Sequence, residues 1–150
     1  MTDPHDVRWM KAAIDLSRRC PPSATAFSVG AIIVSATDEE VASGYSREFD
    51  PLEHAEEAAL TKLVDRPDNA VGSTLYSTLE PCSARASRLL SCTALVLRSG
   101  ITRVVIAWRE PPLFVEGRGY ELLTAAGIAV DELPECADEA RQVNDHLAPG

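Results

Sequence analysis

Three short fragments of the sequence carry residue types that bind a metal ion: His54-Ala55-Glu56, Glu80-Pro81-Cys82 and Cys92. A catalytic zinc ion takes three protein ligands and keeps a fourth position open for water. The imidazole of His54 and the sulfurs of Cys82 and Cys92 would supply those three ligands. The chain has only three histidines, and His54 is the one that lies far from both ends. The fragments therefore predict a zinc site.

Glu56 lies two residues after His54 and is predicted to carry protons rather than to bind the metal. Zinc lowers the pKa of a bound water to about 7. That water must lose a proton to become a nucleophile, and a leaving amine must gain one, so one carboxylate can serve both steps. One histidine and two cysteines on zinc, with a glutamate that is not a ligand, is the arrangement of the zinc deaminases. The pattern thus predicts replacement of an exocyclic amino group by oxygen.

The surrounding elements are expected to bring these fragments to one edge of a sheet. His54 is placed in the first turn of one helix, Cys92 opens another, and Cys82 follows a strand. Helix N-termini stabilise thiolates, and open α/β sheets bind ligands at the carboxyl ends of their strands. The expected strands are 27–34, 41–45, 74–78, 103–107 and one that begins at 128–130. The expected helices are 3–19, 53–64, 92–99, 120–126 and 138–147.

Strands separated by helices predict an α/β fold in a single domain, residues 1–150. The first two strands form an antiparallel hairpin, while the helix between the last two makes them parallel. The expected architecture is a mixed five-stranded sheet with helices on both faces.

The composition of the chain indicates which classes of binding partner it has. The net charge is −9, which disfavours a protein that grips a nucleic-acid backbone. No apolar run reaches membrane-spanning length, and the first residues do not form a signal peptide, so a cytoplasmic location is expected. Disulfides are then not expected among the four cysteines. The expected partner is a small molecule, with no nucleic acid and no membrane.

The motifs resemble those of the cytidine deaminase-like superfamily. His54-Ala55-Glu56 followed by TLYSTLEPC at 74–82 is similar to its deaminase domain of riboflavin biosynthesis, and the resemblance covers roughly residues 25–132. It implies a three-layer α/β/α fold, one zinc per subunit and hydrolytic deamination. It makes His54, Cys82 and Cys92 the zinc ligands and Glu56 the proton carrier. It also implies a homodimer or a larger homo-oligomer.

The sequence departs from that branch at three places. Nine residues separate Cys82 from Cys92, close to the riboflavin branch but not identical with it. Ala84 stands where that branch usually has a histidine. Phe27-Ser28 replaces its usual Asn-Pro pair, and the string Phe27-x-Val-Gly-Ala is similar to that of nucleoside cytidine deaminases. The reductase domain often fused to this deaminase is not found in these 150 residues.

The substrate contacts are predicted from residues that border the metal fragments. Arg85 and Arg88 could pair with a substrate phosphate, and Ser83 could add a hydroxyl contact. Phe27 is a candidate wall for base stacking, and Trp108 a candidate pocket residue. The alternatives are solvated charges for the arginines and core packing for the two aromatic residues.

Several functions agree with these features. The first is a deaminase of a diaminopyrimidine ribosyl phosphate or a related compound, and the second is a cytidine or deoxycytidylate deaminase. A nucleic-acid base deaminase and a non-catalytic zinc protein are further alternatives. In a structural zinc site, Cys20 or Cys136 would supply a fourth ligand.

Overall fold

The computed structural model describes residues 3–82, 91–109 and 119–147. Within these ranges the strands form one sheet in the order β2-β1-β3-β4-β5. The strands are β1 (Gly30–Val34), β2 (Glu40–Tyr45), β3 (Thr74–Leu79), β4 (Arg103–Trp108) and β5 (Ala129–Glu132). The α-helices are α1 (Pro4–Ser17), α2 (Ala55–Thr61), α3 (Cys92–Ser99), α4 (Gly119–Ala125) and α5 (Ala137–Gln142), with short 3-10 helices at Pro67–Ala70 and Pro134–Cys136.

The sheet is mixed, as the sequence predicts. β1 pairs antiparallel with both β2 and β3, whereas β3 pairs parallel with β4 and β4 with β5. β3 is therefore the central strand, with an antiparallel neighbour on one side and a parallel one on the other. Its carboxyl end lies beside that of β4, and this edge receives the segment that leads to Cys82.

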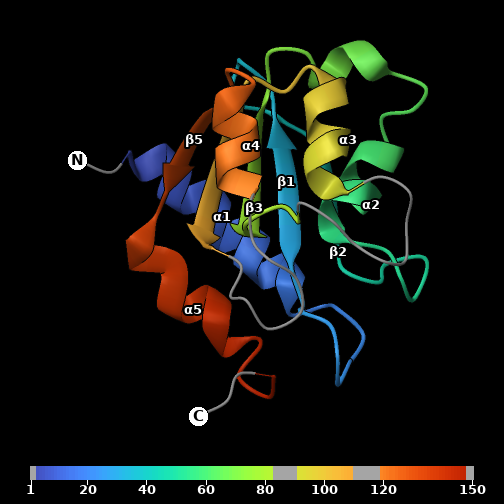
Figure 1. Ribbon diagram of the computed structural model, residues 1–150, viewed down its shortest axis with the longest axis vertical. Helices are drawn as coiled ribbons and strands as arrows, with labels where there is room; N and C mark the ends of the chain where they lie inside the picture. Colours follow the sequence, from blue (N-terminus) through green and yellow to red (C-terminus); the bar gives the residue numbers. More distant parts are fainter. Residues whose placement is uncertain (1–2, 83–90, 110–118, 148–150) are drawn as a thin grey trace.

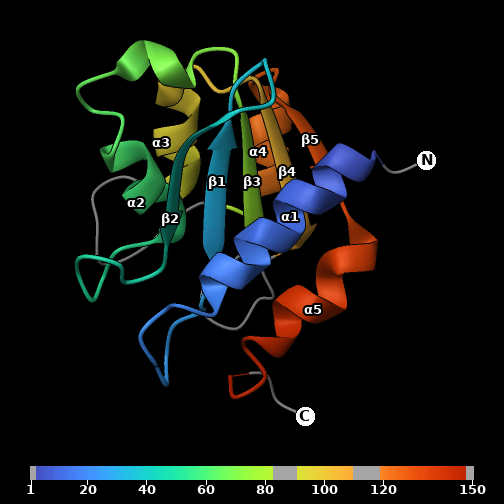
Figure 2. The ribbon, with the colours of Figure 1, turned by 180° about the vertical axis from the view of Figure 1, so that it is seen from behind.

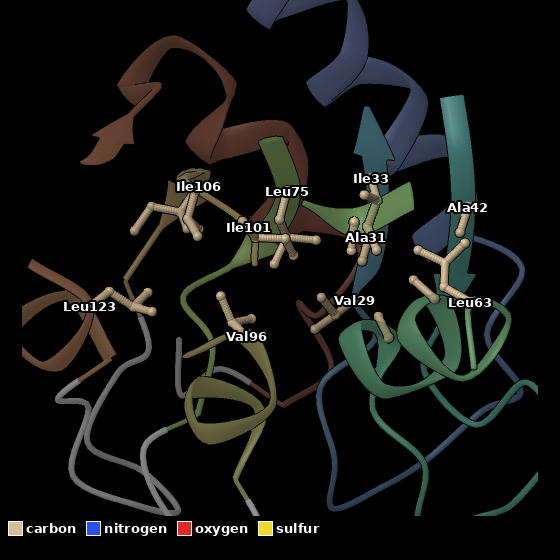
Figure 3. Close-up of a cluster of buried hydrophobic side chains, with 14 of the residues drawn as sticks. Val29, Ala31, Ile33, Ala42, Leu63, Leu75, Val96, Ile101, Ile106 and Leu123 are labelled. Atoms are coloured by element: carbon tan, nitrogen blue, oxygen red, sulfur yellow. The ribbon is translucent and has the colours of Figure 1, made fainter. Parts of the chain in front are cut away.

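Helices cover both faces of the sheet, which confirms the three-layer α/β/α prediction. Helices α2, α3 and α4 lie on one face (Figure 1), and α1 and α5 lie on the other (Figure 2). The first face holds an apolar cluster that includes Ile33, Leu75 and Ile106 from the sheet and Val96 from α3 (Figure 3). No helix among the described residues is long and apolar enough to cross a membrane.

The second face holds a separate apolar cluster. Met10 and Ile14 of α1 pack there with Ile32, Tyr76 and Val105 of the sheet. Neighbouring strand residues point to opposite faces of a sheet, so Leu75 belongs to the first cluster and Tyr76 to the second. This alternation gives each of the two helical layers its own core.

β1 begins at Gly30, so the prediction of a strand from residue 27 is wrong for its first three residues. The backbone N–H of Ser28 donates to Asn144 Oδ1 at 2.6 Å, and Asn144 Nδ2 donates to the Ser28 carbonyl at 3.0 Å. A side chain near the end of the chain thus takes both backbone groups that a neighbouring strand would otherwise pair. The segment before β1 is fixed by this contact instead of by the sheet.

The predicted helices over 53–64 and 138–147 are too long. α2 covers Ala55–Thr61, and the chain continues in i to i+3 turns, with Leu63 N–H donating to the Leu60 carbonyl. α5 covers Ala137–Gln142, and Asn144 and Leu147 make the same kind of turn. α1 likewise ends at Ser17 instead of about residue 19. In each case tighter turns replace the last α-helical hydrogen bonds.

The other helix ends follow the sequence signals. Asp3 caps α1 by accepting the His5 N–H at 2.8 Å. Gly100 follows α3 and Gly127 follows α4, each with φ of 89°, a left-handed conformation that glycine adopts without strain. These ends confirm the predicted start of the first helix and the two glycine stops.

Candidate metal centre

His54 stands at the N-cap of α2, one position before the first helical turn in which it was predicted. Its backbone N–H donates to Glu57 Oε1 at 3.4 Å, so the helix's own third residue fixes the cap. α2 packs closely on β2 at Gly44, where an added Cβ would lie 2.7 Å from the Ala55 carbonyl oxygen. This close packing sets the position of His54 and, two residues later, of Glu56.

Cys82 and Cys92 meet where the segment after β3 reaches the start of α3. Cys92 N–H donates to Cys82 Sγ at 3.2 Å, and Thr93 N–H donates to the Cys82 carbonyl at 3.0 Å. Ser91 caps α3 by accepting the Ala94 N–H. The first amide of the helix therefore points at the Cys82 sulfur and the second at the Cys82 carbonyl, and the N–H on the sulfur stabilises a thiolate.

The three candidate ligand atoms converge. His54 Nδ1 lies 3.6 Å from Cys82 Sγ and 3.3 Å from Cys92 Sγ, and all three atoms lie within 4.8 Å of one another. With Zn–N near 2.05 Å and Zn–S near 2.3 Å, tetrahedral coordination places N and S about 3.6 Å apart. Both the chemistry of these donors and their spacing therefore fit zinc.

The two sulfurs differ in their affinity for a proton. Hydrogen bonds from Cys92, together with the nearby His54, lower the pKa of Cys82 to about 4 despite its burial. Burial first, and then the neighbouring Cys82 and Glu56, raise the pKa of Cys92 well above its usual value. One negative charge in the cluster thus opposes a second. A divalent cation is the ligand that would stabilise both thiolates together.

Glu56 lies beside the cluster, in the first turn of α2, and is only 3% exposed. Ser77 Oγ, on β3, donates to Glu56 Oε1 at 3.1 Å. Burial raises the pKa of Glu56 above its ordinary value, and interactions with His54, Cys92 and Ser77 offset part of that rise. The carboxyl group is thus buried next to the metal ligands, as its predicted role requires.

The structure tests the predictions for the remaining cysteines but not those for the arginines. In the described part of the chain, His54, Cys82 and Cys92 form the one cluster of suitable metal ligands, so neither Cys20 nor Cys136 joins them as a fourth. Cys136 is buried in the apolar cluster on the second face of the sheet, under α1. Arg85, Arg88 and Ser83 lie outside the described residues.

Phe27 and Trp108 contact each other at the carboxyl end of β4. Their rings meet edge to face with centroids 5.6 Å apart. Both pack against the apolar cluster under α2 and α3, and Trp108 also packs against the cluster under α1. Trp108 Nε1 is buried and has no hydrogen-bond partner among the described residues. The structure thus places the two predicted aromatic residues together, and within the described ranges the indole N–H of Trp108 meets no acceptor.

Several residues that hold the site were not found from the sequence. Arg47 donates from Nη1 to the Phe27 carbonyl at 3.1 Å and from Nη2 to Ser28 Oγ at 2.8 Å. Glu80 accepts the Tyr120 N–H at 2.7 Å, which joins α4 to the segment before Cys82. Ser77 supplies the hydroxyl beside Glu56. Ser77 and Glu80 are both buried, and their only sign in the sequence is a polar residue within, or just after, a predicted strand.

Comparison with known proteins identifies relatives of this arrangement. The family model described as the cytidine and deoxycytidylate deaminase zinc-binding region matches residues 3–108. A diaminohydroxyphosphoribosylamino-pyrimidine deaminase of Schizosaccharomyces pombe is 42% identical over 126 residues, 83% of this chain and 31% of that protein. A protein of the same name from Buchnera aphidicola is 35% identical over 84% of this chain and 82% of its own length.

A solved structure agrees with these matches. The Aspergillus oryzae Rib2 deaminase in complex with DARIPP superposes with a TM-score of 0.82 at 26% identity, covering 93% of this chain and 89% of that one. The lengths of the relatives differ, however. The chain spans only about a third of the S. pombe protein but most of the Buchnera protein.

Proposed function

The chain belongs to the cytidine and deoxycytidylate deaminase family, in the branch of the riboflavin-biosynthesis deaminases, and on this premise we propose that it hydrolyses an exocyclic amino group from a diaminopyrimidine ribosyl phosphate. The observation that carries the proposal is the convergence of His54 Nδ1 and the sulfurs of Cys82 and Cys92 within 4.8 Å, beside a buried Glu56.

His54, Cys82 and Cys92 would hold the zinc ion through one nitrogen and two sulfurs. When bound, zinc supplies a Lewis acid that activates a water molecule for attack at neutral pH. The protein's part is to fix the three donor atoms, through the N-cap of α2 and the amides at the start of α3. Three protein donors leave one tetrahedral position for solvent or substrate.

Glu56 would move the protons of the reaction. Its carboxylate takes a proton from the attacking water and delivers it to the ring nitrogen next to the reacting carbon. The bond between that carbon and the amino nitrogen then breaks. The water oxygen stays on the carbon, and its second proton reaches the departing nitrogen through the same carboxyl group, so the products are ammonia and the corresponding ring carbonyl.

Phe27 and Trp108 would form one wall of the substrate pocket. Leu79, three residues before Cys82, pairs with Trp108 in the parallel register of β3 and β4, so both strands end at the same edge. A buried indole N–H without an acceptor costs about 1–3 kcal/mol. This cost supports a role for Trp108 Nε1 as a donor to the substrate. Arg85, Arg88 and Ser83 remain predicted contacts for the phosphoribosyl group.

A substrate panel scored by ammonia release tests this proposal. The panel contains the diaminopyrimidine ribosyl phosphate, the same compound without phosphate, cytidine, dCMP and a tRNA anticodon stem-loop. We expect the phosphorylated diaminopyrimidine to give the highest kcat/KM. Faster turnover of cytidine or dCMP would instead assign the chain to the pyrimidine salvage reaction, and ammonia release from none of them would contradict a deaminase.

We also propose that the chain assembles into a homodimer or larger homo-oligomer. Phe49 and Leu52, which precede His54, are 69% and 53% exposed, and burying apolar surface of this kind favours association. Sedimentation at micromolar concentration should therefore give at least twice the mass of one chain, and a monomer would contradict this assembly. A cytoplasmic location and a single domain stay predictions.

A further inference from the structure

Ser77 is the polar member of an apolar row on β3. Leu75, Ser77 and Leu79 alternate with residues that face α1, and both leucines belong to the cluster packed under α2 and α3 (Figure 3 labels Leu75). Ser77 is 0% exposed. A buried hydroxyl is unfavourable unless it is hydrogen-bonded, so its partners indicate what it does.

The hydroxyl has a single proton, which lies within reach of two acceptors of different origin. Ser77 Oγ lies 2.7 Å from the Leu79 carbonyl oxygen, two residues along the same strand. It also lies 3.1 Å from Glu56 Oε1, on the helix packed above the sheet. The first contact is local and would form with any serine here. The second depends on the packing of α2 on β1 and β2, and it brings the hydroxyl to a carboxylate beside the metal ligands.

We propose that Ser77 is a positioning residue that holds the Glu56 carboxylate in the orientation needed for proton transfer. The inference rests on the proposed function, in which Glu56 carries protons. A glutamate side chain has several rotatable bonds, and α2 is only seven residues long. The hydroxyl, which the Leu79 carbonyl also holds, ties Oε1 of the Glu56 carboxylate to the strand and so restricts its rotation.

The sheet makes Ser77 a rigid support for this contact. Ser77 pairs with Ala31 of β1 on one side and with Ile106 of β4 on the other. Its Cα is therefore held by two neighbouring strands, while Glu56 is held by α2. Because displacement of a catalytic group by about 1 Å can cost about 100-fold in rate, a hydrogen bond between the two elements contributes to kcat.

The test compares two substitutions of nearly identical shape. Ser77→Thr keeps the hydroxyl, whereas Ser77→Val replaces it with a methyl group, and both add the same bulk to the buried site. We expect kcat for the proposed substrate to be about tenfold lower in the valine variant than in the threonine variant. KM should agree within about twofold, and both variants should contain as much zinc as the wild type.

Equal kcat values in the two folded variants would overturn the inference but not the proposed function, because the wild type would still release ammonia from the substrate. If either larger side chain prevents folding, Ser77→Ala replaces the pair. A tenfold lower kcat with unchanged zinc content then supports the positioning role, and an unchanged kcat overturns it. A wild type without deaminase activity would overturn the proposed function, and this inference with it.

Discussion

Two neighbouring residues of β3 direct hydroxyl groups at buried carboxylates on opposite faces of the sheet. Tyr76 Oη donates to Asp6 Oδ1 at 2.6 Å on the α1 face, and Ser77 Oγ donates to Glu56 Oε1 at 3.1 Å on the α2 face. Asp6 also receives two hydrogen bonds from Arg103, at 3.0 and 2.6 Å. Glu56 lies instead beside His54 and two cysteine sulfurs.

The neighbours decide what each carboxyl group can do. Burial alone would raise the pKa of Asp6, but hydrogen bonds from Arg103 and Tyr76 outweigh it and lower the pKa below 3.8. Burial raises the pKa of Glu56, and its neighbours offset only part of this effect. Asp6 therefore remains an anion that joins α1 to the sheet. Glu56 binds protons more readily than an exposed glutamate, which suits a group that must accept and release them.

The two tryptophans repeat this contrast. Trp9 Nε1, on α1, donates to Asp38 Oδ1 at 2.7 Å. Trp108 Nε1, at the end of β4, is buried and has no acceptor in the ranges that the structure describes. Polar groups on the α1 face thus satisfy one another. Among the described residues, Trp108 keeps an unpaired donor, and the cluster of His54, Cys82 and Cys92 keeps charges that a metal ion would neutralise.

The largest expected effect is that of Glu56→Gln, which keeps the size of the side chain but removes its ability to carry protons. We expect kcat to fall about 1,000-fold or more, with zinc content unchanged. Steady-state ammonia release and metal analysis on the same sample measure both quantities. Glu40→Gln, at the exposed start of β2, is the control and should leave kcat within about twofold of wild type. A kcat near that of the wild type in the Glu56 variant would contradict the catalytic role that distinguishes Glu56 from Asp6.

Asp6→Asn should affect stability but not chemistry. We expect the free energy of unfolding at pH 7 to fall by about 2 kcal/mol, because Arg103 loses its charged partner, while kcat below the melting temperature stays within twofold. The pKa of Asp6 is lowered in the folded state, so its contribution is complete above about pH 3.8 and is lost as the pH falls through the lower folded value. Urea titrations of both proteins at pH 7 and pH 3 should show the difference shrinking at the lower pH. A difference that grew at pH 3 would contradict this assignment.

Tyr76→Phe removes the hydroxyl from Asp6 and is the counterpart of the Ser77 variants. We expect a loss of about 1.5 kcal/mol of stability, as for a hydrogen bond to a charged group, with kcat and KM unchanged. Urea unfolding and steady-state kinetics on one preparation give both numbers. A fall in kcat comparable to that from Ser77→Val would contradict the claim that the Tyr76 contact stabilises the fold without affecting catalysis.

Trp108→Phe should produce the smallest effect. The ring remains, but the N–H is lost, so we expect KM for the proposed substrate to rise about fivefold with kcat within twofold, the loss of one modest hydrogen bond. Trp9→Phe is the control on the other face and should leave KM unchanged. If both substitutions left KM unchanged, Trp108 Nε1 would not be a substrate contact.

The metal ligands could be predicted because their types are scarce and their elements converge. Histidine at a helix start, cysteine after a strand and cysteine at a second helix start must meet at the carboxyl edge of an α/β sheet. The antiparallel pairing of β1 with β2 and the parallel pairing of β4 with β5 could be predicted from their connections in the same way.

The supporting contacts could not be predicted, because they join side chains far apart in the sequence. Asn144 lies 116 residues from Ser28, yet it replaces the sheet as the partner of that backbone. The contact of Ser77 with Glu56 depends on how α2 packs on β1 and β2, which no local pattern specifies. Helix ends were also misplaced where i to i+3 turns compete closely with α-helical hydrogen bonds, as after α2 and α5.

Zinc X-ray absorption on purified protein tests the central claim most directly, because it counts the sulfur atoms around the metal. If His54, Cys82 and Cys92 hold the ion, the protein contains one zinc per chain with two sulfurs at about 2.3 Å and two lighter N or O atoms at about 2.0 to 2.1 Å. Protein without zinc, or a zinc ion surrounded by four sulfur atoms, would contradict the account.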